Sequence, residues 1–259
     1  CNVYVMSIER TKTGIKGFDA LIEGGFPTGN TILLTGTPGT GKTIFGLEYV
    51  YNGVTKFKER SLYVSFEQPV HMLKQQASQF GWDLEPLLKK GSLQVDYVPI
   101  KDLNPDTVDT IIKKIQKDKI KRLVVDSIST LAINAPIYTA VKDISLVDIM
   151  KGQSFFSPPV LGDLIVKRFI YNFVDALHIM DHTCTTLLLS ESAEKGEFLS
   201  RDTVSEFIAD GVILVTFESM GGEFSRNLTV RKMRHTKNDE DVHPLEISSK
   251  GLVVHSIGK

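Results

Sequence analysis

The chain has 259 residues, of which 42% are apolar and 24% are charged, and its 30 basic residues nearly balance 31 acidic ones. These proportions predict a globular protein with a substantial core and exclude disordered, collagen-like and coiled-coil chains. A formal net charge of −1 creates no overall positive field that would attract nucleic acid, so any contact with nucleic acid has to be local.

Hydropathy and cysteine content bear on the cellular compartment. The longest apolar stretches, such as 211–217, are far shorter than the roughly 20 residues that cross a bilayer. Cys1 and Cys184 are the only cysteines, and no apolar segment follows a basic start at the N-terminus. This pattern predicts neither a disulfide framework nor a secretory signal, and we expect a cytoplasmic protein that contacts no membrane.

The first half of the chain predicts a repeated alternation of strand and helix. Four apolar runs rich in strand-forming residues are predicted to be strands: 31–35, 61–66, 93–97 and 122–126. Each of the first three is followed by a segment in which apolar residues recur at helical spacing. Such alternation is typical of a mostly parallel sheet covered by helices.

The second half of the chain predicts a different arrangement. Residues 134–160 show no sustained period and are expected to form a long loop or insertion, before a helix at 161–180 and a buried strand at 185–189. Four strands without helices between them are then predicted: 211–217, 227–234, 244–248 and 251–257. We expect one α/β domain over residues 1–259, its mostly parallel sheet extended by antiparallel strands within 218–257.

Residues 36–43 carry the strongest motif. They read Gly-Thr-Pro-Gly-Thr-Gly-Lys-Thr, which matches the phosphate-loop pattern GxxxxGK followed by Ser or Thr, between a predicted strand and a predicted helix. Backbone N–H groups of such a loop and the positive end of the helix dipole bind phosphates, while the Lys meets the phosphates and the Thr hydroxyl binds Mg²⁺. The predicted nucleotide-binding residues are Thr37, Pro38, Gly39, Thr40, Gly41, Lys42 and Thr43.

Two carboxylates follow predicted strands at the same end of the sheet. Asp126 closes the strand 122–126, where it could hold Mg²⁺ together with Thr43. Many phosphate-loop ATPases place a catalytic Glu directly after this Asp, but here Ser127 follows, so the base has to come from elsewhere. Glu67, just past the strand 61–66, is the best candidate to polarise an attacking water; the alternative is a solvated Glu at a strand end.

Two cations are predicted to project from one strand near the C-terminus. Lys232 and Arg234 share the parity of Leu228 and Val230, which places the cations on one face about 7 Å apart. Adjacent like charges require an anion. That anion is either an acidic neighbour on the next strand, such as Glu246, or a phosphate.

Two other sequence patterns are not assigned a role in ligand binding. Residues 236–239 fit the guanine-reading pattern Thr-Lys-x-Asp of GTPases, but no DxxG motif accompanies it, so we discount guanine recognition. A dense basic cluster at 113–122 resembles a nucleic-acid patch. Its lysines lie opposite the apolar side of the predicted helix, which indicates a solvated helix face.

Several motifs occur in an order that resembles a known family. They are Thr13-Gly-Ile-Lys-Gly-Phe-Asp19, Gly24-Gly-Phe-Pro27, the phosphate loop, Ser65-Phe-Glu-Gln68, Phe80-Gly-Trp-Asp-Leu84, Val125-Asp-Ser127, Glu206-Phe-Ile-Ala-Asp-Gly-Val212 and Gly222-Glu-Phe-Ser-Arg226 followed by Lys232-Met-Arg234. Together these segments resemble the KaiC-like ATPases of the RecA superfamily. The resemblance extends from about residue 10 to residue 257.

The resemblance implies a RecA-type core that binds ATP with Mg²⁺ and assembles into a ring, usually a hexamer, with each nucleotide between neighbouring subunits. It implies that Glu67 is the catalytic carboxylate and that Lys232 and Arg234 reach the phosphates held by the adjacent subunit. Gln79 matches a position near the nucleotide base, and Thr236 completes the predicted set of nucleotide-binding residues.

Three departures from the family pattern limit which of the family's functions can be expected of this chain. The clock protein of the family has two such domains in tandem, whereas this chain has room for one. Gln68 stands where the family often has a second Glu, and Glu206 and Phe207 replace the Ser-Thr pair of the autophosphorylating domain. We therefore expect an oligomeric regulatory or signalling ATPase with a low rate of turnover and without autokinase activity at that place.

Two alternatives remain open. A recombinase-like protein would contact single-stranded DNA through the loops after Asp126 and Leu189, but both loops carry balanced charges, which disfavours DNA binding. An ATP-dependent scaffold with little turnover is the other, because Gln68 cannot act as a base.

Overall fold

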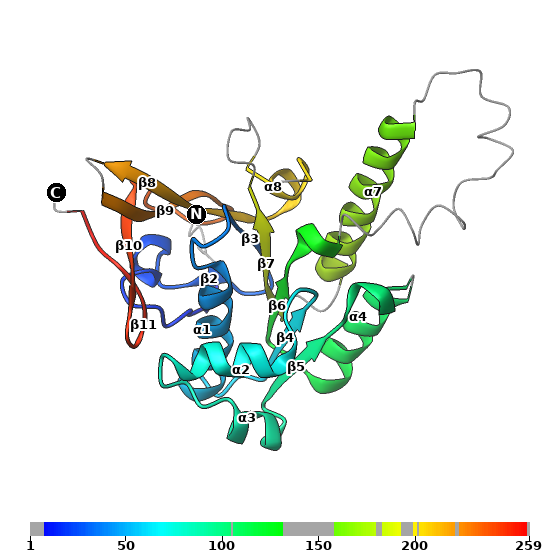
Figure 1. The fold of residues 1–259 in the computed structure, drawn as a ribbon, viewed down its shortest axis with the longest axis horizontal. Helices are drawn as coiled ribbons and strands as arrows, with labels where there is room; N and C mark the ends of the chain where they lie inside the picture. The colour runs from blue at the N-terminus through cyan, green and yellow to red at the C-terminus, as the bar shows by residue number, and fades with distance from the viewer. Residues whose placement is uncertain are drawn as a thin grey trace, which may run out of the picture.

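The computed structural model describes residues 8–104, 106–131, 158–179, 183–192, 199–200, 202–220 and 223–257. The described residues form one large sheet with the strand order β11-β10-β9-β8-β3-β7-β6-β4-β5, and a small ribbon of β1 (Arg10–Thr11) and β2 (Phe26–Pro27) (Figure 1). The strands of the large sheet are β3 (Thr31–Gly36), β4 (Ser61–Ser65), β5 (Leu93–Tyr97), β6 (Arg122–Asp126), β7 (Thr185–Glu191), β8 (Gly211–Met220), β9 (Glu223–Met233), β10 (His243–Ser248) and β11 (Gly251–Val254).

Strand direction divides the sheet into two parts. From β8 through β3, β7, β6 and β4 to β5, every neighbouring pair is parallel. From β8 onward to β9, β10 and β11, every pair is antiparallel. This arrangement confirms the predicted fold class, a RecA-type α/β core with a mostly parallel sheet that is extended by C-terminal antiparallel strands.

Helices cover both faces of the parallel part. They are α1 (Lys42–Thr55), α2 (Val70–Ser78), α3 (Glu85–Lys90), α4 (Thr107–Asp118), α7 (Pro158–Ile179) and α8 (Ser205–Ile208), with short 3-10 turns η1 (Asp19–Ile22) and η2 (Ile100–Asp102). Buried residues of α1 and α2 belong to one core cluster, and those of α4 and α7 belong to a second cluster on the other side of the sheet (Figure 1). Among the described helices, none is both long and apolar enough to span a bilayer.

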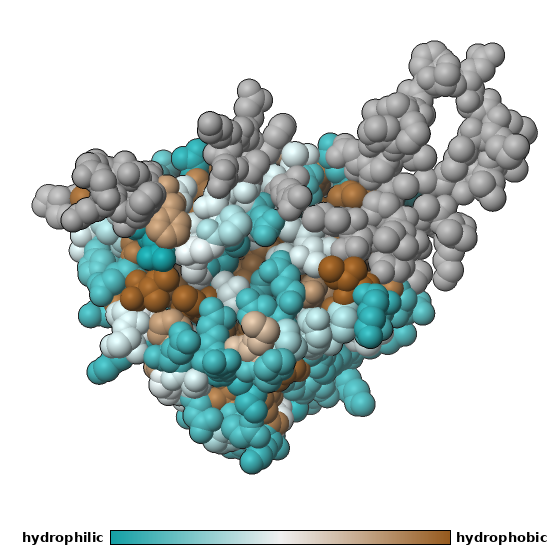
Figure 2. Space-filling view, viewed as in Figure 1, coloured by the Kyte–Doolittle hydropathy of each residue, from teal (hydrophilic) through white to brown (hydrophobic). Residues whose placement is uncertain are grey.

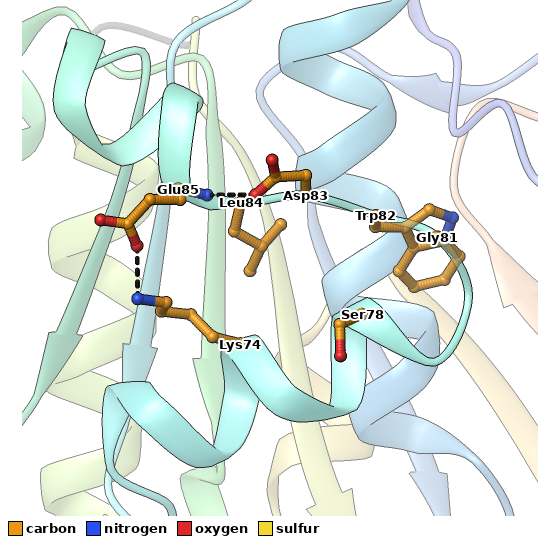
Figure 3. Close-up of a pocket in the computed structure, with 7 residues that line it drawn as sticks. All are labelled: Lys74, Ser78, Gly81, Trp82, Asp83, Leu84 and Glu85. Carbon is orange, nitrogen blue, oxygen red and sulfur yellow. Dashed lines mark hydrogen bonds and ion pairs between the residues drawn. The ribbon is translucent and has the colours of Figure 1, made fainter.

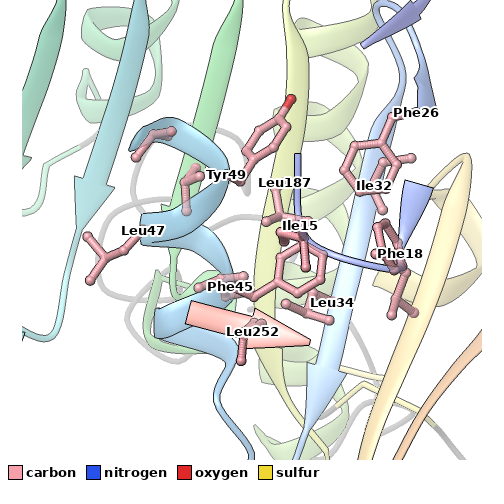
Figure 4. Close-up of a cluster of buried hydrophobic side chains, with 14 of the residues drawn as sticks. Ile15, Phe18, Phe26, Ile32, Leu34, Phe45, Leu47, Tyr49, Leu187 and Leu252 are labelled. Carbon is pink, nitrogen blue, oxygen red and sulfur yellow. The ribbon is translucent and has the colours of Figure 1, made fainter. Parts of the chain in front are cut away.

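The first core cluster joins the N-terminal segment to the sheet and to α1 (Figure 4). The ring of Phe18 packs edge-on against Phe26 and Phe45, with ring centroids 5.7 Å and 5.2 Å apart. Phe26 makes a similar contact with Tyr49 of α1 at 5.8 Å. These aromatic contacts hold α1 against the N-terminal segment that carries Phe18 and Phe26.

Element boundaries agree with the predictions where the apolar pattern is long. The strands at 93–97 and 122–126 end where the sequence predicted, whereas α7 begins at Pro158, inside the segment predicted to be irregular. The rest of that segment, 134–157, lies outside the described residues. Helix α3 was not predicted, because six residues are too few to show a helical period.

Figure 2 shows that the side of the molecule seen in Figure 1 is mostly hydrophilic, with apolar residues in small patches.

The basic cluster at 113–122 is only partly a solvated face. Lys113, Lys117, Lys119 and Lys121 are exposed, but Lys114 forms an ion pair with Asp96 at 2.5 Å.

Arg122 departs from the predicted solvated face, because its side chain is completely buried. Its guanidinium lies 4.7 Å from the ring centroid of Tyr49 and 4.9 Å from that of Phe57. Its Nε donates to Glu59 at 2.5 Å, and Gly53 leaves space for the side chain, since a Cβ there would lie 2.4 Å from the Arg122 Cδ. Arg122 therefore joins the start of β6 to α1 through cation–π and ionic contacts.

Replacing Arg122 by Ala should lower the free energy of unfolding by about 3 kcal/mol, because Glu59 loses its partner and the aromatic rings lose their packing. Urea unfolding followed by the fluorescence of Trp82, the single tryptophan, measures this change. The exposed Arg60 is the matched control, and Arg60→Ala should change stability by about 0.5 kcal/mol or less. Equal losses in the two variants would contradict the role of Arg122.

Candidate functional site

The phosphate loop connects the end of β3 to the start of α1. Gly39 and Gly41 have φ values of 83° and 104°, in the region that side chains disfavour, so the turn depends on glycine at both positions. Thr40 donates its hydroxyl to the carbonyl of Thr37 at 2.8 Å, which closes the loop. The first N–H groups of the 14-residue helix α1 therefore begin directly behind the loop, as anion binding requires.

Lys42 lies across this loop. Its Nζ donates to the carbonyls of Gly36 at 2.7 Å and Thr37 at 2.9 Å. Burial lowers the pKa of the Lys42 amine, and the nearby carboxylates of Glu191, Asp126 and Glu67 raise it in part. The lysine is thus a partly desolvated cation at the loop. Its desolvation strengthens a charge-assisted hydrogen bond to a phosphate, whereas the neighbouring carboxylates oppose the approach of a phosphate.

Asp126 is buried and lies against the start of α1. Its Oδ2 accepts hydrogen bonds from the Thr43 hydroxyl at 3.0 Å and the Tyr63 hydroxyl at 2.6 Å. Burial raises the pKa of Asp126 to about 6, although the hydrogen bond from Tyr63 acts in the opposite direction. The structure therefore brings Thr43 and Asp126 together, as the sequence predicted.

Thr43 and Asp126 offer a hydroxyl and a carboxylate oxygen, which are donors that suit Mg²⁺. No group of three or more His, Cys, Asp or Glu residues that could hold a metal ion occurs within the described ranges. This donor set fits an ion that takes its remaining ligands from phosphate and water, as Mg²⁺ does in nucleotide sites.

Glu67 lies just past β4 and is exposed. Its Oε1 accepts hydrogen bonds from the hydroxyls of Ser127 at 2.5 Å and Thr130 at 2.7 Å. Neither hydroxyl residue was predicted to belong to the site, although Ser127 directly follows Asp126 at the same end of the sheet. Gln68 approaches the neighbouring Ser65 through its backbone N–H at 2.9 Å.

Glu191 is a further acidic residue that the sequence interpretation missed. It is the last residue of β7 and pairs in register with Gly36 at the end of β3. Among the carboxylates that raise the pKa of Lys42, Glu191 has the largest effect. Its signal in the sequence was the same as that of Asp126, an acidic residue that follows a buried strand.

Lys232 and Arg234 do not lie where the strand pattern placed them. A β-bulge shifts the register between β8 and β9 by one residue, which reverses the alternation of side chains. The expectation that these cations share a face with Leu228 and Val230 is therefore wrong. Met233 is the residue that joins Leu228 and Val230 in the core.

Both cations have partners within the chain, but Glu246 is not one of them. Lys232 donates to the carbonyl of Ala209 at 2.6 Å and to carbonyls of α8, and Arg234 forms an ion pair with Asp210 at 2.9 Å. Glu246 pairs instead with His255 at 2.8 Å. The end of β9 therefore faces the segment around α8.

The cations are far from the phosphate loop of their own chain. Met233 pairs with Gly211, and Asp210 bonds to Thr31 at the start of β3, whereas the loop begins at Gly36. The two ends of β3, Thr31 and Gly36, are five residue steps apart, which is about 16 Å. Within one chain the structure does not bring Lys232 and Arg234 to the loop.

Thr236 and Gln79 are the last two of the predicted nucleotide-binding residues. Thr236 accepts a hydrogen bond from Arg10 at 2.6 Å, and Gln79 is an exposed residue directly after α2. The loops expected to contact DNA fall mainly on 132–157 and 193–198, outside the described residues.

A separate hollow of about 290 Å³ lies between α2 and α3 (Figure 3). Lys74 and Glu85 form an ion pair at its edge, and Trp82 lines it together with Leu84. None of the residues predicted to bind nucleotide lines this hollow.

Solved and curated proteins resemble this chain over nearly its whole length. The solved structure of a KaiC-like protein from Pyrococcus horikoshii superposes with a TM-score of 0.75 at 30% identity and covers 96% of this chain and 100% of its own. A UPF0273 protein of the same organism is 30% identical over 262 residues, which are 95% of this chain and 94% of that protein.

The circadian clock oscillator protein KaiC of Parathermosynechococcus lividus is 28% identical over 265 residues. The alignment covers 97% of this chain but 43% of that protein, so the chain spans less than half of the clock protein. The family described as "ATPase: KaiC" matches residues 11–154 and 163–259. With the RecA-type sheet and the phosphate loop, this match shows that the chain belongs to the KaiC family of ATPases.

Proposed function

We propose that this protein binds ATP with Mg²⁺ and hydrolyses it as a homo-oligomeric ring, a hexamer by its resemblance to the family, in a regulatory or signalling role. The observation that carries the proposal is the convergence of Lys42, Thr43, Asp126 and Glu67 where β3, β4 and β6 end. Ligands of parallel α/β sheets bind at this end of the strands.

Nucleotide binding is assigned to the loop and its two oxygen donors. Backbone N–H groups of 37–43 and the Lys42 amine bind the phosphates, and Lys42 exchanges its carbonyl partners for phosphate oxygens. Thr43 and Asp126 would hold Mg²⁺, which when bound offsets the negative charge of the phosphate oxygens.

Hydrolysis is assigned to Glu67. A water oxygen attacks the γ-phosphorus, the bond from that phosphorus to the bridging oxygen of ADP breaks, and the water proton passes to the Glu67 carboxylate. Ser127 and Thr130 both donate to Oε1 of Glu67, so they fix the carboxylate through one oxygen. The other oxygen, Oε2, is then the one that would accept the proton of the water. Gln68 supplies no base at this position.

Within the described residues, the contacts at the loop place no cation besides Lys42 that could meet the charge developing on the transferred phosphoryl group. Lys232 and Arg234 lie at the opposite end of the sheet, about one strand length from their own loop. A neighbouring subunit in a ring can present this end to the loop, which supports a site shared between two subunits.

Lys42→Ala should weaken ATP binding by roughly 10- to 100-fold, because the loop loses the charged donor that contacts the phosphates. Isothermal titration calorimetry with Mg-ATP measures this affinity. Lys56→Ala, at the exposed far end of α1, is the matched control and should bind ATP normally. Unchanged affinity in Lys42→Ala would overturn the assignment of the loop.

Glu67→Gln should preserve ATP binding and lower turnover by roughly 10²- to 10⁴-fold, the usual scale of a general base. Phosphate release measures turnover, and Gln68→Ala should affect it much less. If both variants hydrolyse ATP at the same rate, Glu67 is not the base. If the unmodified protein releases no phosphate, the scaffold alternative holds.

Arg234→Ala should lower turnover by roughly 10³- to 10⁵-fold, the scale of an arginine supplied across an interface. Mixed in equal amounts with Glu67→Gln, it should regain activity, since about one interface in four then pairs an intact Glu67 with an intact Arg234. Specific activity of the unmodified protein should also rise with its concentration. A mixture no more active than the sum of its parts would contradict the shared site.

A further inference from the structure

The turn at 233–236, which carries Arg234, is bonded from one side by Asp210 and from the other by Arg10. Asp210 binds the Arg234 side chain, and Arg10 binds His235 and Thr236. His235 has a φ of 58°, so the chain reverses sharply at this point. Contacts at the two ends of such a tight turn restrain the conformation of its residues.

Asp210 anchors the first side to the sheet and to α7. Its Oδ1 accepts from Arg234 at 2.9 Å, and its Oδ2 accepts from the Thr31 N–H at 2.9 Å and lies 3.0 Å from the His178 Nε2. The backbones also pair, because Arg234 N donates to Asp210 O at 2.9 Å and Asp210 N donates to Thr31 O at 2.8 Å. The carboxylate is therefore fixed to the start of β3 before it meets the guanidinium.

Arg10 anchors the second side through both of its terminal nitrogens. Nη1 donates to Thr236 Oγ1 at 2.6 Å, and Nη2 donates to His235 O at 3.2 Å and to Glu23 Oε2 at 2.7 Å. The Arg10 side chain is only 15% exposed, whereas that of Arg234 is 48% exposed. Arg10 is thus a largely buried residue that stabilises the fold, whereas about half of the Arg234 side chain is exposed at the surface.

The ion pair leaves most of the Arg234 guanidinium available. Within the described part of the chain, the side chain donates through Nη1 to Asp210 alone, although a guanidinium carries five N–H groups. A group that stabilises developing charge acts best when its donors are oriented before the reaction begins. We call the contacts of Asp210 and Arg10 with the turn at 233–236 the clamp. Arg234 meets this condition because the clamp fixes its direction and leaves several of its N–H donors unused.

We infer that Arg10 and Asp210 are positioning residues that aim Arg234 at the nucleotide held by a neighbouring subunit. The inference rests on the proposed function, in which Arg234 acts across the subunit interface. It adds that the aim of this cation is set by two residues 200 positions apart in the chain, neither of which touches the nucleotide of its own subunit.

The first test is Arg10→Gln, with Lys12→Gln as the matched control, because Lys12 is an exposed cation of the same segment. Arg10→Gln should lower kcat for ATP hydrolysis by roughly 10- to 100-fold, the scale of a misplaced catalytic group, and leave the affinity for Mg-ATP unchanged. Arg10→Lys should recover little, because an ammonium cannot bridge the same acceptors. A kcat equal to that of Lys12→Gln would overturn the inference.

Mixing experiments separate positioning from general damage. Arg10→Gln subunits should be rescued by Glu67→Gln subunits, which carry an intact clamp and an intact Arg234. They should not be rescued by Arg234→Ala subunits, because every interface then receives a defective cation. Rescue by Arg234→Ala would show that Arg10 acts on the site of its own subunit and would overturn the inference.

Asp210→Asn provides a second variant, in which the amide oxygen can still accept from Thr31 but the charge that holds Arg234 is lost. It should show the same pattern of rescue, with thermal unfolding and oligomer mass measured alongside to confirm that both variants fold and assemble. Variants that fold but no longer assemble would overturn the inference in favour of an interface role. If Glu67→Gln and Arg234→Ala fail to rescue each other, the proposed function fails. If that pair does rescue each other but Arg10→Gln and Asp210→Asn do not show the same pattern of rescue as Arg234→Ala, only this inference fails.

Discussion

The burial of the Asp126 carboxylate is the constraint on which the site depends. Its pKa rises from an ordinary value of 3.8 to about 6, so the folded state holds the proton more tightly than the unfolded chain and loses stability as the pH rises through this window. Stability alone would not favour an ionised carboxylate here at neutral pH. Thr43 and Tyr63 offset part of the cost, and together they join α1, β4 and β6 around one oxygen atom. A group kept at such a cost is typical of a functional site, and a bound cation beside it offsets the cost further.

The sheet that holds this carboxylate also separates the charged groups of the chain. Acidic residues and the loop lie where β3, β4, β6 and β7 end, whereas Arg234 lies with Asp210 at the start of β3. A hydrogen-bonded parallel sheet does not bend enough to close a gap of about 16 Å. Under the proposed function, each chain would contribute one of these two groups to a shared site, and association of chains would bring them together.

Much of this arrangement could be predicted from the sequence, because the parallel core is built from long apolar runs with clear spacing. The position of Asp126 beside the phosphate loop follows from the rule that parallel strands end at one edge. The bulge in β9 was missed because strict alternation was assumed, although the apolar pattern marks it: Leu228 and Val230 are two residues apart, and the next core residue, Met233, follows after three. Arg122 and Arg10 were also inaccessible to pattern reasoning. Their partners Glu59 and Thr236 lie 63 and 226 residues away, and only the folded chain brings them together.

Lys232 and Arg234, at the end of β9, differ in how many of their hydrogen-bond donors are free to bind a phosphate. Lys232 directs its ammonium to three backbone carbonyls at 206–209, and burial together with Arg234 lowers the pKa of Lys232. A phosphate has to displace those carbonyls before it can bind Lys232, whereas Arg234 already presents unused donors. If Lys232 acts as proposed, its binding to a phosphate would free the carbonyls that end α8, a four-residue helix with little hydrogen bonding of its own to replace them. The exposed Phe207 lies on that helix, so the contacts of Lys232 connect the end of β9 to a short helix that carries a surface aromatic residue.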